Sequence, residues 1–144
     1  MAIFKTFEAL GEAFAKIEKL PYDVLISDVL KKHEKELSKL NTEQLDDGVN
    51  QEGGSLPNYA LSTKKFRAKL GLKTSPMDLK VTGLYHKSIK PNISSKDFKM
   101  ISEGVEYSKY LKKFNPEGLT DESLQEFIDT LFINSLINKV KSKI

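Results

Sequence analysis

A short alternating segment in the middle of the chain constrains the fold most. Residues 77–82 read Met-Asp-Leu-Lys-Val-Thr, so apolar and polar side chains alternate at every position. This period of two is typical of a half-buried β-strand. Gly83 supplies a turn, and residues 85–94 and 96–104 provide a second and a third strand candidate. The sequence therefore predicts a three-stranded antiparallel meander within residues 77–104.

Helical periodicity flanks this segment on both sides. Apolar residues recur at spacings of three and four in residues 4–17, 24–40, 107–114 and 124–136, and a short basic helix is predicted within residues 59–71. Pro21 separates the first two helices. A meander of this size is only marginally stable alone, so we expect a helix on at least one face. The predicted fold class is α+β, in which N-terminal, central and C-terminal helices pack with the meander.

The length of the chain, 144 residues, fits a single domain. We expect a helical N-terminal part at residues 1–40, a loop with a short helix at 41–76, the meander at 77–104 and C-terminal helices at 105–144. The apolar stripe of the first helix fits either the core of the domain or a groove on a partner, and the sequence leaves both readings open. This stripe contains Phe4, Phe7 and Phe14.

The composition excludes several classes of function. The net charge of +3, from 23 basic and 20 acidic residues, is too small to indicate nucleic-acid binding by itself. The absence of cysteine excludes disulfides, thiolate metal sites and cysteine nucleophiles, and it fits a reducing compartment. The N-terminus carries Glu8 and Glu12 without a long apolar run, so neither a secretory signal nor a membrane span is expected.

Few residues have the spacing that chemistry requires. His33 and His86 lack the further ligands of a metal site and the serine or cysteine pattern of a nucleophilic site. The acidic, glycine-rich residues 46–54 lack the spacing of a calcium loop. Acid–base catalysis would need carboxylates such as Asp78 and Glu103, which nothing in the spacing singles out. We therefore predict a protein that is not an enzyme and holds no cofactor or metal.

The densest basic run falls on the predicted short helix. A solvated helix face is the favoured reading, because the lysines fall on different sides and no aromatic residues alternate with them to form a stacking platform. Contact with DNA phosphates or with an acidic partner is the alternative, and it would make the protein a nucleic-acid-binding accessory protein that uses residues 64–69. The basic residues are Lys64, Lys65, Arg67, Lys69 and Lys73.

About half of the chain, residues 41–114, resembles small phage structural proteins, mainly from phages of Bacteroidetes-type hosts. The shared pattern is an Asn–x–x–Gln–Leu segment, a glycine-rich turn, a tyrosine-containing helix and a Leu–x–x–Thr–Gly turn. More loosely, "TGLYHKSI" with the later "EYSKYLKKF" is similar to neck and tail-completion proteins. The residues that carry the pattern are Asn41, Gln44, Leu45, Gly48, Tyr59, Ser62 or Thr63, Lys69, Leu79, Thr82 and Gly83.

This resemblance implies a virion protein of the head–tail connector (neck) or tail-completion type. It further implies a homo-oligomeric ring assembled in the host cytoplasm, which docks to portal, adaptor or tail proteins and whose lumen passes DNA. The implied contact surfaces are the loop 46–58, the turn 82–86 and the basic helix 64–69. Within them, the candidate interface residues are Asp46, Asp47, Asn50, Tyr59, Thr82, Gly83, Tyr85 and His86.

Overall fold

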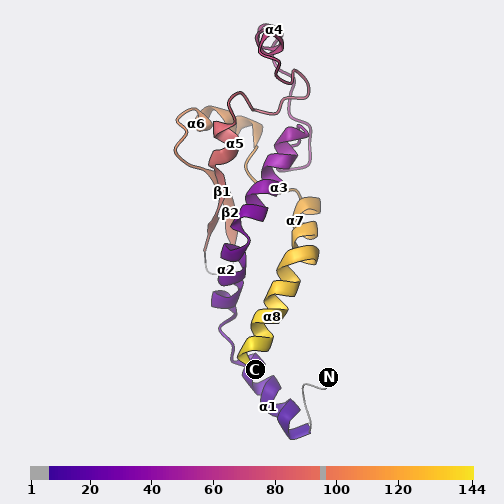
Figure 1. Cartoon of the computed structure of the whole chain (residues 1–144), viewed down its shortest axis with the longest axis vertical. Helices are drawn as coiled ribbons and strands as arrows, with labels where there is room; N and C mark the ends of the chain where they lie inside the picture. Colours follow the sequence, from indigo (N-terminus) through magenta and orange to yellow (C-terminus); the bar gives the residue numbers. More distant parts are fainter. Residues whose placement is uncertain (1–6, 95–96) are drawn as a thin grey trace.

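A computed structural model describes residues 7–94 and 97–144 of the chain as an elongated, mostly helical molecule with one two-stranded sheet (Figure 1). In chain order the elements are α1 (Phe7–Glu18), α2 (Tyr22–Lys32), α3 (Glu34–Asp46), α4 (Leu61–Lys69), α5 (Leu84–Ser88), β1 (Ile89–Ile93), β2 (Phe98–Ser102), α6 (Ser108–Leu111), the 3₁₀ turn η1 (Lys112–Phe114), α7 (Asp121–Phe127), the π-helical η2 (Ile128–Phe132) and α8 (Ile133–Lys143).

Helices α2 and α3 follow one another as a rod through the middle of the molecule (Figure 1). Leu30, Leu37 and Leu45 are buried along this rod. Full burial of one leucine side chain stabilises the fold by about 1.5–3 kcal/mol. The rod is interrupted only at His33, whose ring is buried against the edge of Phe127 and whose Nε2 lies 2.8 Å from Ser135 Oγ. The helical periodicity predicted here is therefore present, and it continues to Asp46 instead of ending near residue 40.

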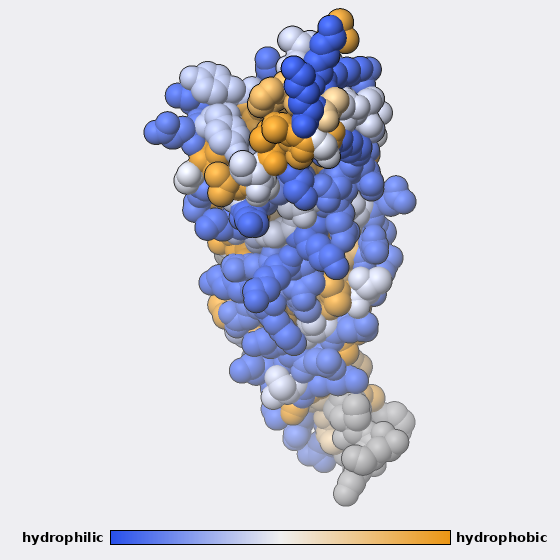
Figure 2. All heavy atoms as spheres, turned by 45° about the horizontal axis from the view of Figure 1, so that its top comes forward, coloured by the Kyte–Doolittle hydropathy of each residue, from blue (hydrophilic) through white to orange (hydrophobic). Residues whose placement is uncertain are grey.

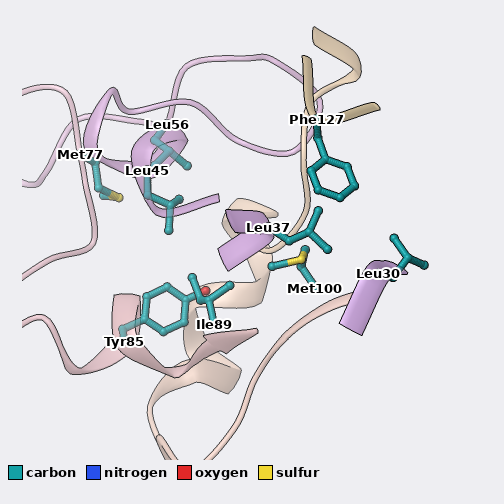
Figure 3. Close-up of a cluster of buried hydrophobic side chains, with 9 residues drawn as sticks. All are labelled: Leu30, Leu37, Leu45, Leu56, Met77, Tyr85, Ile89, Met100 and Phe127. Atoms are coloured by element: carbon teal, nitrogen blue, oxygen red, sulfur yellow. The ribbon is translucent and has the colours of Figure 1, made fainter. Parts of the chain in front are cut away.

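The rod is the middle of three layers. The β1–β2 hairpin covers one side, and the continuous helical segment α7–η2–α8 lies along the other (Figure 1). Thr120 caps the start of α7, because its hydroxyl accepts a hydrogen bond from the backbone N–H of Ser123 at 3.1 Å. The core lies where these layers meet (Figure 3), and its buried members are Leu30, Leu37, Leu45, Leu56, Met77, Tyr85, Ile89, Met100 and Phe127.

The predicted three-stranded meander is wrong. The sheet has two strands, β1 and β2, which pair antiparallel from Ile89 opposite Ser102 to Ile93 opposite Phe98. Residues 77–81 form no strand. Their alternation is not an alternation of burial, because Met77 and Asp78 are both buried while Val81 is 57% exposed.

Backbone geometry explains why the first predicted strand does not form. Leu79 has a φ of +59°, in the left-handed region that extended strands do not occupy. Gly83 has a φ of +87° and begins α5, so residues 84–88 are helical where a returning strand is predicted. Only the second part of that predicted strand, from Ile89, is extended, and it pairs with the predicted third strand. The buried Asp78, not a sheet, fixes the path of this segment.

The first helix leaves its apolar stripe partly open. Phe4 lies outside the described residues, and Phe14 is 57% exposed. Leu10 and Ile17 are half-buried, and α1 contacts α8 at the end of the molecule where the C-terminus lies (Figure 1). The helix therefore packs on its own molecule through α8, and docking of the stripe on a partner stays a prediction.

Candidate docking surface at the α4 end

Helix α4 stands apart from the three layers, at the end of the molecule opposite α1 (Figure 1). The only fully buried side chain in it belongs to Arg67, which is 2% exposed. Its large apolar side chains point outward instead: Leu61 is 69% exposed and Phe66 58%, and Leu70, the C-cap residue, is 54% exposed. The helix is therefore inverted relative to an ordinary surface helix, whose apolar face packs on the core.

Arg67 anchors α4 through a buried ion pair. Its Nη2 donates to Asp78 Oδ1 at 2.8 Å, and both side chains are less than one-tenth exposed. Its Nε donates to the backbone carbonyl of Lys73 at 2.7 Å. One side chain thus ties the helix both to the loop that follows it and to the segment that carries Asp78. A buried arginine needs such partners, because an unpaired buried charge is strongly destabilising.

Tyr59 completes this anchor. Its ring lies 4.3 Å from the Arg67 guanidinium carbon, in a cation–π contact. Its hydroxyl donates to Asp78 Oδ1 at 3.1 Å and accepts from the backbone N–H of Leu79 at 2.9 Å. Burial raises the pKa of Tyr59 above its ordinary value, although the Leu79 N–H acts in the opposite direction. The hydroxyl therefore remains a neutral donor at neutral pH.

The outward face of α4 consists of two neighbouring stripes at helical spacing. Leu61, Lys65 and Lys69 form one, and Phe66 and Leu70 lie on the next. Apolar atoms gather at this end of the molecule, as Figure 2 shows. The α5 and α6 region lies towards the same end (Figure 1) and adds four exposed apolar or aromatic side chains, Val81, Leu84, Tyr107 and Tyr110.

The residues predicted for the 82–86 turn divide between surface and core. Thr82 is exposed, and its hydroxyl accepts from the Leu84 N–H at 3.3 Å. Tyr85 is 1% exposed and belongs to the core cluster. His86 is also buried, with Nε2 2.7 Å from the Asp78 backbone carbonyl. Gly83 is buried as well and serves as the start of α5. Only Thr82 of this group offers its side chain to a partner.

The residues predicted for the 46–58 loop are nearer the surface. Asp46 and Asp47 are exposed at the end of α3. Asn50 Oδ1 accepts from the backbone N–H groups of Glu52 at 3.0 Å and Gly54 at 2.9 Å, which closes a compact turn. Asn50 therefore shapes the loop, while the Asp46 carboxylate lies 3.7 Å from His86 Nδ1 and the Asp47 side chain is exposed.

The five predicted basic residues do not form one cationic face. Arg67 is committed to Asp78, and Lys73 Nζ donates to the backbone carbonyl of Asp46. Lys64 is half-buried. Lys65 and Lys69 remain exposed on the outward face of α4, beside its apolar stripe.

Two buried amide side chains have a structural role that the sequence did not reveal. Asn41 Nδ2 donates to the Pro116 carbonyl, and Asn41 Oδ1 accepts from the Gly118 N–H, both at 2.9 Å. Gln44 repeats this arrangement with the Gly118 carbonyl and the Thr120 N–H, also at 2.9 Å. The two residues hold the turn that precedes α7. The available signal was the presence of amides one turn and two turns after Leu37 on an otherwise apolar stripe.

The remaining described residues carry no arrangement for metal chemistry. No group of three or more His, Asp or Glu side chains within residues 7–94 and 97–144 is placed to hold a metal ion. Among the same residues, none of the helices combines the length and apolar character needed to span a bilayer. Comparisons of the chain with protein-family models, curated proteins and solved structures found no match.

Proposed function

We propose that this protein is a structural virion subunit of the head–tail connector (neck) or tail-completion type, which acts by docking to copies of itself and to other virion proteins. The observation that carries the proposal is the inverted helix α4, with Arg67 buried and Phe66 and Leu70 exposed. Covering a large apolar side chain contributes about 1.5–3 kcal/mol. Exposed apolar patches that polar residues surround are typical of protein–protein contact sites.

The buried polar residues support this proposal, because their hydrogen bonds fix the position of exposed segments. Arg67 and Asp78 fix α4, and Asn41 and Gln44 fix the turn before α7. A preorganised surface loses less conformational freedom when it binds, so more of its contact free energy remains as affinity.

The elongated shape suits head-to-tail assembly. The docking face lies at the α4 end, and the rest of the molecule extends away from it (Figure 1). A contact between two different faces of identical subunits closes into a ring when the rotation per subunit divides a full turn. The resemblance of residues 41–114 to phage neck and tail-completion proteins favours such a ring. The proposed site of action is accordingly the virion, after assembly in the host cytoplasm.

Nucleic-acid binding by residues 64–69 is weaker as an explanation. Arg67 is occupied by Asp78, so the basic helix presents two fully exposed lysines, Lys65 and Lys69, together with the half-buried Lys64. Each phosphate contact contributes a salt-dependent increment to affinity, and two or three such contacts give only weak binding.

Imaging tests the proposal. We expect the purified full-length protein to form ring particles of uniform diameter in negative stain, either alone or with head or tail components. A protein that stays monomeric at every concentration and joins neither component would contradict it. Retention on DNA at low salt without any multimer would favour the nucleic-acid alternative.

A further inference from the structure

A second surface of the molecule complements the outward face of α4. A hollow of about 960 Å³ lies between α3, the loop that follows it and the beginning of α7. Its lining includes three half-buried apolar side chains, those of Leu40, Val49 and Leu119. The hollow is therefore a polar basin with an apolar component, distinct from the α4 face.

Carboxylates dominate the charge of this hollow. Its lining contains no lysine and no arginine. One of the carboxylates, Glu43, lies 3.7 Å from Lys39 in an exposed ion pair, and another, Glu52, accepts a hydrogen bond from Asn115 at 3.1 Å. The acidic lining residues are Glu43, Asp47, Glu52, Asp121, Glu122 and Glu126.

The outward face of α4 has the opposite character. The helix contains no acidic residue, and its exposed stripes combine Lys65 and Lys69 with Leu61, Phe66 and Leu70. Within its own molecule this face remains uncovered, since these apolar side chains are all more than half exposed. A contact between the two surfaces must therefore join two molecules.

We propose that α4 of one copy docks into the acidic hollow of a second copy. Apolar side chains of α4 cover Leu40, Val49 and Leu119, while Lys65 and Lys69 face the carboxylates around them. This inference rests on the proposed self-assembly, and it assigns the surfaces through which two copies touch. Because α4 and the hollow are different surfaces, each copy keeps one of them free for the next copy, and the contact propagates around a ring.

Two charge-reversal variants test the contact. The first, Lys65→Glu with Lys69→Glu, changes α4; the second, Glu122→Lys with Glu126→Lys, changes the hollow. All four side chains are exposed. Alone, each variant should associate at least about tenfold more weakly than the natural protein, because the new glutamates of the first variant face the carboxylates of the hollow, and the new lysines of the second face Lys65 and Lys69. The charge-matched control for the α4 variant is Lys32→Glu with Lys99→Glu, two exposed lysines on α2 and β2, which should associate normally.

Mixing the two variants in equal amounts gives the decisive result. In an alternating mixture the new glutamates of one variant face the new lysines of the other, and Lys65 and Lys69 face unchanged carboxylates, so assembly should recover relative to either variant alone. Such recovery also shows that both variants are folded. In sedimentation velocity experiments, we expect the mixture to sediment as multimers. Each variant alone should sediment as a monomer.

Three other outcomes would contradict either the docking mode or the proposed self-assembly. If the hollow variant alone assembles normally, the docking mode is wrong and self-assembly uses another surface. If the mixture fails to assemble while both variants melt like the natural protein, the docking mode is also wrong. If the unaltered protein is a monomer at all concentrations, the self-assembly in the proposed function is wrong, and the inference falls with it.

Discussion

The Arg67 guanidinium donates to the Asp78 carboxylate at 2.8 Å, and this buried contact connects α4 to the segment that leads into the core. The same carboxylate oxygen accepts from the Tyr59 hydroxyl and from the Lys80 backbone N–H. The contact determines where the exposed face of α4 points. The helix packs on no large apolar surface of its own, so its position depends on these polar interactions.

Replacing Arg67 with methionine should loosen α4. The change leaves Asp78 buried without its cation, and the loss of one partner from a buried pair costs about 3–5 kcal/mol. We expect backbone amide exchange in α4 to accelerate strongly, measured by hydrogen–deuterium exchange with mass spectrometry. Lys69→Met, on the exposed side of the same helix, is the control. Equal protection of α4 in the two variants would show that the ion pair does not hold the helix.

Replacing Asn41 with alanine should destabilise the whole fold. The change removes two 2.9 Å hydrogen bonds and leaves the Pro116 carbonyl and the Gly118 N–H buried without partners. Each such group costs about 1–3 kcal/mol. Thr42→Ala, which removes only a bond to the Lys39 carbonyl in the same helix, should change the free energy of unfolding by less than about 0.5 kcal/mol. Urea unfolding compares the two, and equal midpoints would refute the proposed role of the amide.

Gly48 should tolerate alanine less well than Gly53. Both have positive φ, +71° and +86°, so both substitutions bear the cost of a left-handed residue, about 1–2 kcal/mol. A Cβ at Gly48 would also approach Pro76 Cγ to 2.4 Å, whereas a Cβ at Gly53 would meet nothing within 4 Å. Thermal unfolding should therefore show the larger loss for Gly48→Ala. A smaller loss there would mean that the two loops are not packed as described.

Tyr85 should make the protein sensitive to alkali. Burial, together with the nearby Glu117 carboxylate, raises the pKa of Tyr85 above its ordinary value. The folded state then retains a proton that the unfolded state loses above about pH 10. The stability from this group is complete below that pH and falls as the pH rises, by up to about 1.4 kcal/mol per pH unit.

The measurement is the free energy of unfolding between pH 8 and pH 12. Tyr85→Phe should flatten the decline above about pH 10, because phenylalanine cannot ionise. Tyr110→Phe, whose side chain is 67% exposed, should decline as the natural protein does. An unchanged decline in Tyr85→Phe would exclude Tyr85 as its source.

Sequence reasoning recovered the helices better than the sheet, for a physical reason. The spacing of Leu30 and Leu37 within the predicted helix places them on one face of the rod, and both are buried, whereas the buried Leu45 lies beyond the predicted end of that helix. In residues 77–82 the same kind of reasoning failed. A period of two describes a strand only when a neighbouring strand pairs with it, and here Asp78 is drawn inward to Arg67 instead. That long-range pairing leaves no local mark in the sequence.

The candidate site was foreseen in part. The sequence singled out the basic helix, and Lys65 and Lys69 do lie on its exposed face. The inversion of the helix was not predictable, since it depends on Arg67 meeting both Asp78 and the ring of Tyr59. Tyr85 and His86 were proposed for an interface, but both are buried, because α5 turns them towards the core.

The central claim is that the outward face of α4 is a contact surface between subunits. Its most direct test is the solution mass, by sedimentation equilibrium over a range of concentrations, of the natural protein and of two matched variants. Phe66 and Phe14 are equally exposed, at 58% and 57%, on opposite ends of the molecule. We predict a multimer for the natural protein and for Phe14→Ser, and a shift towards monomer for Phe66→Ser. A natural protein that is monomeric throughout, or a Phe66→Ser variant that assembles as the natural protein does, would contradict the claim.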